Sequence, residues 1–215
     1  MTTSNRPLPT LRIGLAALLA AAALLTAAAP AGARVVLSNG HVDVGSAVVD
    51  NGKLRFLVKD DTGSRLAWRD PDDVTIRVVG AAATRLPSGM GFVGREGKRV
   101  WMIPQVQRRG VIWAGWNTEE VSPSEVRGGV NWILRRVTGP GRVVVFQTGS
   151  FGEHDVIFNT DRRMPQAYGI RPGVHAHANW AFTAKGVYRM SFAMLARTEA
   201  GKRIGDRGVL TIKVG

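Results

Sequence analysis

Cysteine is absent from this 215-residue sequence, although its N-terminus has the features of an export signal. Exported domains often depend on disulfides, so this chain has to be stabilised by its apolar core alone. About 180 residues are long enough to bury such a core, as one larger or two small domains. The same absence means that any zinc site has to use imidazole and carboxylate ligands.

Acidic residues are also few, because 16 Asp and Glu face 29 Lys and Arg, for a formal net charge of +13. Excess positive charge favours attraction to anionic polymers such as cell-wall teichoic acids, to phospholipid headgroups or to nucleic acid. No run of basic residues exceeds two and no nucleic-acid-binding motif is present, so no specific nucleic acid is expected. The alternative interpretation is a solvated basic surface without a partner.

Only one long apolar run occurs, between Ile13 and about Ala29, after Arg6 and Arg12. Small residues follow it, and the pattern predicts a secretory signal peptide over residues 1–33, cut after Ala33. An uncleaved anchor is the alternative. The mature chain, 34–215, would carry a charge of +13 minus 2, or +11. We expect one secreted or cell-envelope-associated domain without a transmembrane segment.

The mature chain has no sustained helical periodicity, and alternation of apolar and polar residues dominates it. Only residues 122–126 and the stretch near Ala196 could hold a helical turn. The pattern predicts an all-β antiparallel sandwich, immunoglobulin-like and with long loops. Its expected strands are 41–49, 53–59, 74–79, 99–103, 130–137, 142–147, 186–195 and 208–214.

Two stretches show little alternation. Residues 160–173 mix Asp, Arg, Pro and Gly, and residues 80–97 are rich in Gly and Ala. Both are predicted to be long loops, which in compact domains often carry binding sites. The second stretch has the alternative of a poorly ordered spacer.

The strongest candidate for a functional site is the pentad His-Ala-His-Ala-Asn that begins at His175. In a strand, His175, His177 and Asn179 would share one face, while Trp180 and Phe182 point to the other. One face would then be polar and the other would belong to the core. A His-x-His pair on a strand is a common way to bring two imidazoles to one cation.

His41 and Asp43 are likewise two residues apart, so they would share a face of their own strand. If these strands lay side by side, His41, Asp43, His175 and His177 would present four ligands to one ion. Zinc suits this set best among the divalent transition metals, because manganese and iron prefer more oxygen ligands. The alternative is a polar patch whose hydrogen bonds order a loop. Weaker binding candidates are Asn179, Trp116, Gln105 and Gln147.

Enzymatic interpretations are weaker. His154 lies near Ser150 and Asp155, but a triad depends on geometry and no Gly-x-Ser-x-Gly elbow occurs in the mature chain. A loop position is expected for His154. The acids Glu119, Glu120 and Glu125 lie near tryptophans and could belong to a carbohydrate site. The six tryptophans are more simply explained by core packing, with the glutamines bonded to backbone or lining a groove.

Six motifs follow one another along the mature chain: Gly-His-Val-Asp-Val-Gly, Trp-Met-Ile-Pro-Gln, Ala-Gly-Trp-Asn-Thr-Glu, Gln-Thr-Gly-Ser-Phe-Gly, His-Ala-His-Ala-Asn-Trp-Ala-Phe and Gly-Val-Tyr-Arg. Together they resemble the actinobacterial surface-anchored domain family, also called choice-of-anchor M proteins. The resemblance spans almost the whole mature chain, and residues 175–214 are similar to the family's wall-associated repeat. It implies an exported, wall-associated or secreted protein with no established enzymatic activity, often encoded beside a metal-type ABC transporter. The anchoring tails common in the family are not seen here.

Overall fold

The computed structural model describes residues 1–2 and 34–215, so the predicted signal peptide lies outside the described residues. The described residues 34–215 belong to one compact unit. Its structure is all-β, as predicted, with only two short 3-10 helices, η1 (Pro71–Asp73) and η2 (Gly80–Ala82). Neither helix has the length or the apolar character needed to cross a membrane.

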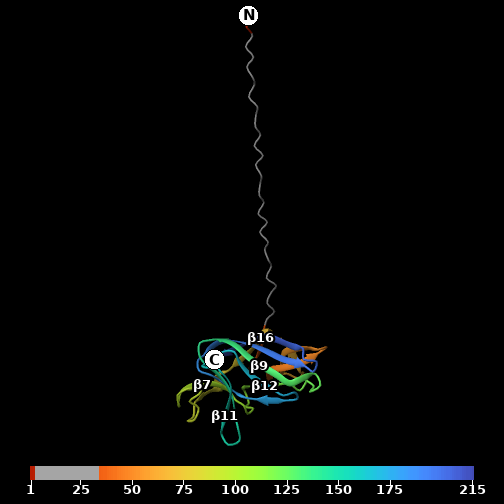
Figure 1. The fold of residues 1–215 in the computed structure, drawn as a ribbon. Coiled ribbons are helices and arrows are strands. Elements are labelled where there is room, and N and C mark those ends of the chain that lie inside the picture. The colour runs from red at the N-terminus through yellow and green to blue at the C-terminus, as the bar shows by residue number, and fades with distance from the viewer. Residues whose placement is uncertain (3–33) are drawn as a thin grey trace. The chain divides into compact units, whose positions relative to one another are not determined.

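The strands form three sheets (Figure 1). The six-stranded sheet contains, in spatial order, β1 (Val35–Leu37), β5 (Val74–Val78), β16 (Arg203–Val214), β15 (Gly186–Thr198), β9 (Val126–Thr138) and β12 (Gln166–Ile170). The sheet here called the β10 sheet contains β11 (His154–Asn159), β10 (Val143–Thr148), β14 (Asn179–Phe182), β7 (Arg99–Ile103) and β6 (Ala83–Arg85). The β8 sheet contains β13 (His175–His177), β8 (Ile112–Asn117), β2 (Gly40–Asp50), β3 (Lys53–Asp61) and β4 (Ala67–Arg69).

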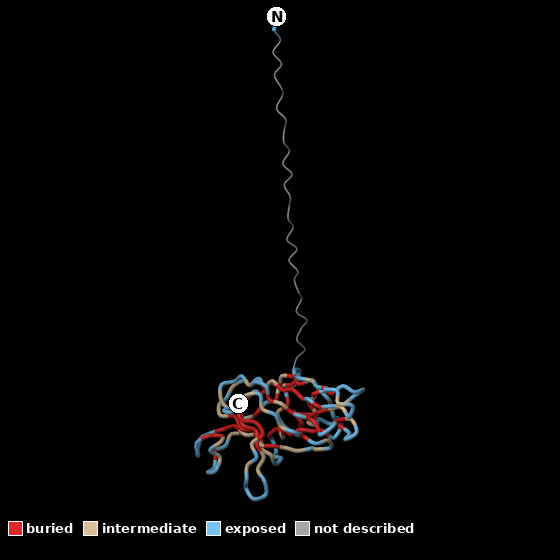
Figure 2. Tube along the Cα trace, in the orientation of Figure 1, coloured by how far each residue is buried: buried red, intermediate tan, exposed pale blue. Residues whose placement is uncertain are grey.

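The main core lies between the six-stranded sheet and the two five-stranded sheets, and buried residues gather in the interior (Figure 2). Trp132 of β9 is at its centre and is fully buried. Its ring lies 6.0 Å from the rings of both Trp116 on β8 and Trp180 on β14, and 5.1 Å from Phe158 on β11. Burial of these large aromatic side chains stabilises the core of a chain that has no disulfides. The core role predicted for the tryptophans is confirmed for these three.

Strand pairing differs in part from the expected antiparallel pattern. Most ladders are antiparallel, but β5 pairs in parallel with β1 and β16, and β2 pairs in parallel with β8. Strand β1 has only three residues, and the register between β2 and β8 is irregular. Alternation of apolar and polar residues carries no information about strand direction. The immunoglobulin-like detail of the prediction stays a prediction.

Both stretches expected to be loops contain strands. The segment 160–173 includes β12, and residues 80–97 include η2 and β6. The latter segment also places Leu86 and Val93 in a second, smaller core cluster with Phe146, so the spacer alternative is wrong. These strands are short, and glycines interrupt their alternation. Residues 122–125 do make a turn, with the amide of Glu125 donating to the carbonyl of Ser122, whereas Ala196 lies in β15.

The histidine pentad does not form one continuous strand. His175 and His177 lie in β13 of the β8 sheet, and Asn179 begins β14 of the β10 sheet. Ala178, which is fully buried, is the point at which the chain passes from one sheet to the other. Trp180 and Phe182 are buried as predicted. The change of sheet separates Asn179 from the two histidines.

Candidate metal centre

Four side chains from two strands converge on one point: His41 and Asp43 from β2, and His175 and His177 from β13. The Nε2 atom of His41 lies 3.1 Å from Nε2 of His175 and 3.2 Å from Nε2 of His177. The Oδ1 atom of Asp43 lies 3.4 Å from Nε2 of His41 and 3.1 Å from Nε2 of His175. All four candidate ligand atoms lie within 4.8 Å of one another.

Hydrogen bonds among these residues do not account for the cluster. A ring nitrogen carries either one proton or one lone pair, so Nε2 of His41 cannot bond to both other imidazoles and to Asp43 at once. A tetrahedral zinc ion with bonds of about 2.0 to 2.1 Å has ligand atoms about 3.3 Å apart. Four of the six distances between the candidate ligand atoms are close to that value, and the other two are within 4.8 Å. The cluster is therefore close in size to a zinc coordination shell.

The strands that supply the ligands are not neighbours, contrary to the expected side-by-side arrangement. Strand β8 lies between them, paired in parallel with β2 and antiparallel with β13. Gly115 of β8 is the register partner of both Asp43 and His177. A β-carbon at Gly115 would lie 2.6 Å from Oδ1 of Asp43 and 2.6 Å from the carbonyl oxygen of Ala176. The ligands meet across the middle strand because this residue has no side chain.

A β-bulge follows Asp43 directly, because the register of β2 shifts between Asp43 and Ser46 against β3. The hydroxyl of Ser46 donates to the carbonyl of Asp43 across the bulge. Gly45 then faces Trp132, which a β-carbon would approach to 2.8 Å. Bulges are a common means of re-aiming a side chain near a site. Here the bulge lets Asp43 face the histidines while the following residues return to the core.

Asp43 has no exposed side-chain surface, and its ion-pair partners in the described chain are His41 and His175. A buried carboxylate without a cationic partner is costly, so a bound cation would compensate it. Its other oxygen, Oδ2, accepts a weak 3.4 Å hydrogen bond from the buried amide of Asn117. This amide orients the carboxylate and leaves Oδ1 toward the ring nitrogens.

Outer carboxylates lie behind two of the imidazoles. Oδ2 of Asp61 is 3.6 Å from Nδ1 of His41, and Oε2 of Glu119 is 3.8 Å from Nδ1 of His175. Glu119 is itself held by Asn117 and by Lys59 at 3.2 Å. The hydrogen bond from Asn117 and the charge of Lys59 lower the pKa of Glu119. Such carboxylate–histidine contacts orient the ring and make it a better metal ligand.

His177 is the most enclosed imidazole. Its ring stacks on the indole of Trp113 with centroids 3.7 Å apart and planes 9° from parallel. The indole nitrogen of Trp113 donates to the carbonyl of Gln105, which fixes the ring. Burial lowers the pKa of His177 to about 4, so its imidazole is neutral near pH 7 and its lone pair is available.

His41 behaves in the opposite way. Its hydrogen bond to Asp43, with a further contribution from Asp61, raises the pKa of His41 above the usual 6.5. A metal ion therefore has to displace a proton from His41 before all three imidazoles can bind. The side chains of His41 and His175 are 16% and 32% exposed, so solvent and ions reach the cluster from this side.

The weaker candidates lie beside the cluster. Asn179 accepts a hydrogen bond from the amide of Gln105, and Gln147 donates to the carbonyl of His177. Gln105 also donates to the carbonyl of Thr148. These side chains hold backbone segments in place, in agreement with the first alternative for the glutamines. Trp116 is buried in the core on the other face of β8.

The remaining candidates are dispersed. His154 begins β11 rather than lying in a loop, and its ring packs against Phe92 and Phe146. Glu120 and Glu125 are outside the cluster, whereas Glu119 is part of its outer shell. Reasoning from sequence missed Gly115, Trp113, Asn117 and Asp61. Trp113, Gly115 and Asn117 are spaced two apart along β8, and Asp61 on β3 lies opposite His41. These relations can be recognised only once the strand pairing is known.

Comparison with family models, with curated proteins and with solved structures yields no match to this chain.

Proposed function

We propose that this chain is a secreted or cell-surface binding protein, without enzymatic activity, that takes up a divalent transition metal, zinc first. The ligands are His41, Asp43, His175 and His177. The observation that carries the proposal is the convergence of three Nε2 atoms and one carboxylate oxygen at 3.1 to 3.4 Å. The predicted export signal and the family resemblance support the location and an association with a metal-type ABC transporter.

Ligand chemistry favours zinc. Three neutral nitrogens and one carboxylate oxygen suit a borderline-soft ion with tetrahedral geometry. Calcium and magnesium prefer shells made of oxygen, with six or more ligands. Copper and nickel bind imidazole strongly but favour tetragonal or square-planar shells. Four of the six distances between ligand atoms are close to the edge of such a tetrahedron, so zinc should be retained in preference to calcium and magnesium when supplied at equal concentration.

Binding is favoured over catalysis because four protein ligands complete a tetrahedral shell. Catalytic zinc sites keep a position open for water or substrate. The partial exposure of His41 and His175 leaves a path for the ion to enter and leave. A site that is complete yet reachable suits capture and release.

The proposal is tested by titrating the purified chain with zinc in competition with a chromogenic chelator. A binding free energy of about 10 to 16 kcal/mol for a four-ligand zinc site corresponds to about 3 kcal/mol per ligand. Loss of one ligand in His175→Ala should therefore weaken zinc binding by roughly 100-fold or more. His177→Ala should do the same. His154→Ala is the matched control, because it removes the one histidine outside the cluster. Stoichiometric binding lost only in the first two variants supports the site.

Negligible zinc on the wild-type chain, or equal losses in all three variants, would contradict the proposal. Circular dichroism of each variant establishes that the fold persists. His175 is the preferred position because its side chain is 32% exposed, the more exposed of the two substituted histidines.

A further inference from the structure

Charge is strongly segregated on the six-stranded sheet. Its strands β5, β9, β15 and β16 carry nine basic residues and one acidic residue, Asp206. The side chain of Asp206 accepts a hydrogen bond from the amide of Phe56 and pairs with Arg55, both on β3. Its charge is therefore already compensated. The basic residues are Arg77, Arg127, Arg135, Arg136, Arg189, Arg197, Arg203, Arg207 and Lys213.

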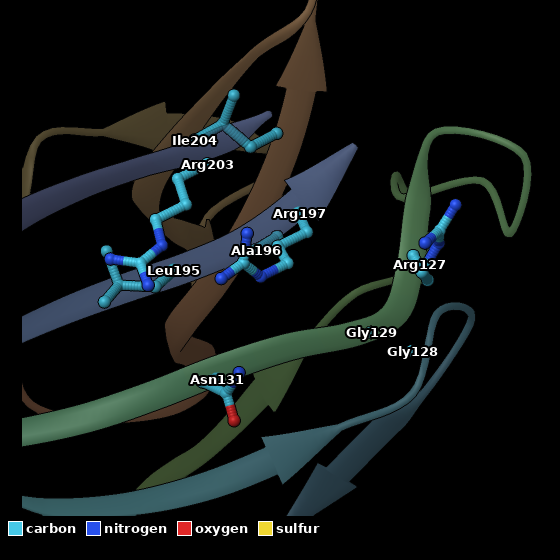
Figure 3. A pocket seen from close by; sticks show the side chains of 9 residues that line it. All are labelled: Arg127, Gly128, Gly129, Asn131, Leu195, Ala196, Arg197, Arg203 and Ile204. Carbon is cyan, nitrogen blue, oxygen red and sulfur yellow. The ribbon is translucent and has the colours of Figure 1, made fainter. Parts of the chain in front are cut away.

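Several of these arginines line three adjoining hollows on the sheet, of about 270, 420 and 320 Å³. The first two hollows share Leu195, Arg203 and Ile204, and the last two share Arg135 and Arg207. Together they form a continuous groove over β9, β15 and β16. We call this the arginine groove. Figure 3 shows one end of it, lined by side chains of β9, β15 and β16.

The arginines at the centre of the groove are available to bind a ligand. Arg135, Arg203 and Arg207 are exposed, and their side chains make no ion pair with any other described residue. At the end of the groove Arg127 lies 4.0 Å from Glu199, and Arg197 donates to the carbonyl of Gly201. Guanidinium groups left free in a hollow are suited to bind phosphate or carboxylate oxygens.

The spacing indicates a chain of charges rather than a single anion. Arg203 and Arg207 are four residues apart on β16, which is about 13 Å along a strand. Arg197 lies directly opposite Arg203 on β15. One phosphate cannot reach both ends of such a row, whereas a linear polymer with repeating phosphates can contact each guanidinium in turn.

The residues that line the groove exclude two other anionic partners. The one aromatic residue among them, Phe192, is buried at 1% exposure, so bases would have no accessible ring to stack on. Leu195 is the one large apolar side chain of the groove that is strongly exposed, and the exposed aromatics Trp68 and Phe151 lie on other sheets or turns. Binding in a bilayer interface requires several inserted apolar residues.

We propose that the arginine groove binds a linear phosphate polymer, through guanidinium contacts to successive phosphate groups. This function is separate from the metal cluster and needs none of its residues. The polymer lies along β15 and β16 and is held electrostatically, with the apolar floor around Leu195 in contact with the backbone of the polymer.

The test measures the affinity of the full chain for long-chain inorganic polyphosphate at several salt concentrations. Replacing Arg135, Arg203 and Arg207 with Gln should weaken binding by roughly 30- to 100-fold at low salt and reduce the logarithmic salt slope by about 2. The matched control replaces Arg99, Arg109 and Arg163 with Gln. These are exposed, lie outside the groove and lower the net charge equally. The control should lose less than about threefold.

Equal losses in both triple variants would overturn the proposal, because net charge alone would then explain binding. Unchanged binding in the groove variant would overturn it as well. Orthophosphate, single-stranded DNA and vesicles rich in an anionic phospholipid are the comparison ligands. Tighter binding to DNA or vesicles than to polyphosphate, lost in the groove variant, would contradict the assigned ligand. Unaltered circular dichroism spectra of both variants show that the fold is intact, and this check does not depend on the metal proposal.

Discussion

The metal cluster and the arginine groove represent opposite ways of making a binding site from strands. The cluster gathers four groups within 4.8 Å, and every ligand atom has a defined neighbour. The groove spreads guanidinium groups over three strands, and the two acids that line it, Asp72 and Asp206, already accept hydrogen bonds from backbone amides of the chain. Short-range geometry governs binding at the metal cluster, whereas long-range charge governs binding in the arginine groove. Small steric or protonation changes should therefore disturb the cluster and leave the groove unaffected.

The largest difference between the two sites is expected from adding one methyl group at Gly115. Gly115→Ala would place a β-carbon 2.6 Å from both Oδ1 of Asp43 and the carbonyl of Ala176. Because the backbone of β13 has to move to make room, we expect zinc affinity to fall by about 100-fold, comparable to loss of a ligand. Chelator competition measures this, and polyphosphate binding should not change.

Gly169→Ala is the matched control, since Gly169 also lies in a strand and a β-carbon there would meet nothing within 4 Å. Thermal unfolding of both variants separates loss of the site from loss of the fold. A folded Gly115→Ala protein with wild-type zinc affinity would show that the strand spacing does not control the cluster.

The next largest difference between the metal cluster and the arginine groove is expected in the pH dependence of binding. The pKa of His41 is raised by Asp43, so its imidazole is increasingly protonated as the pH falls through a value above 6.5. His177, with its pKa lowered to about 4, stays neutral over the same range. Between pH 7.5 and 5.5 the proton on His41 alone should weaken zinc binding by about 10-fold or more. Arginine does not titrate here, so polyphosphate affinity should stay constant.

The measurement is zinc affinity at half-unit pH steps, with His41→Ala as reference. That variant should bind weakly and lose most of the pH dependence above pH 6. A wild-type affinity that is flat from pH 7.5 to 5.5 would argue against His41 as a ligand.

The smallest effect is expected from the outer shell. Glu119→Gln removes the carboxylate 3.8 Å from Nδ1 of His175 but leaves a side chain of the same shape. Zinc affinity should fall about 5- to 10-fold, at the low end for such contacts because Glu119 is half exposed. Glu120→Gln, an adjacent exposed acid, is the control. A drop of equal size in both variants would reflect net charge near the cluster rather than orientation of His175.

Local pattern was sufficient to predict much of this protein. Strand β3 alternates throughout between buried and more exposed positions and was predicted within two residues at each end. Strand β16 alternates over only part of its length and was predicted over its C-terminal half. The four ligand residues could be predicted because His-x-His and His-x-Asp are local patterns with a period of two. Strands β11 and β12 were missed, since Gly, Pro and charged residues interrupt the alternation around them.

What the amino-acid pattern determined is which side chains share a face, because the pleat of a strand enforces that over two residues. Which strands meet is decided by pairing between segments 58 to 72 residues apart, and only the folded chain shows that β8 lies between β2 and β13. Gly115 has no local feature that distinguishes it from other glycines, yet its missing side chain leaves the space in which the cluster forms. The candidate ligands were therefore encoded locally, whereas their convergence is a property of the sheet.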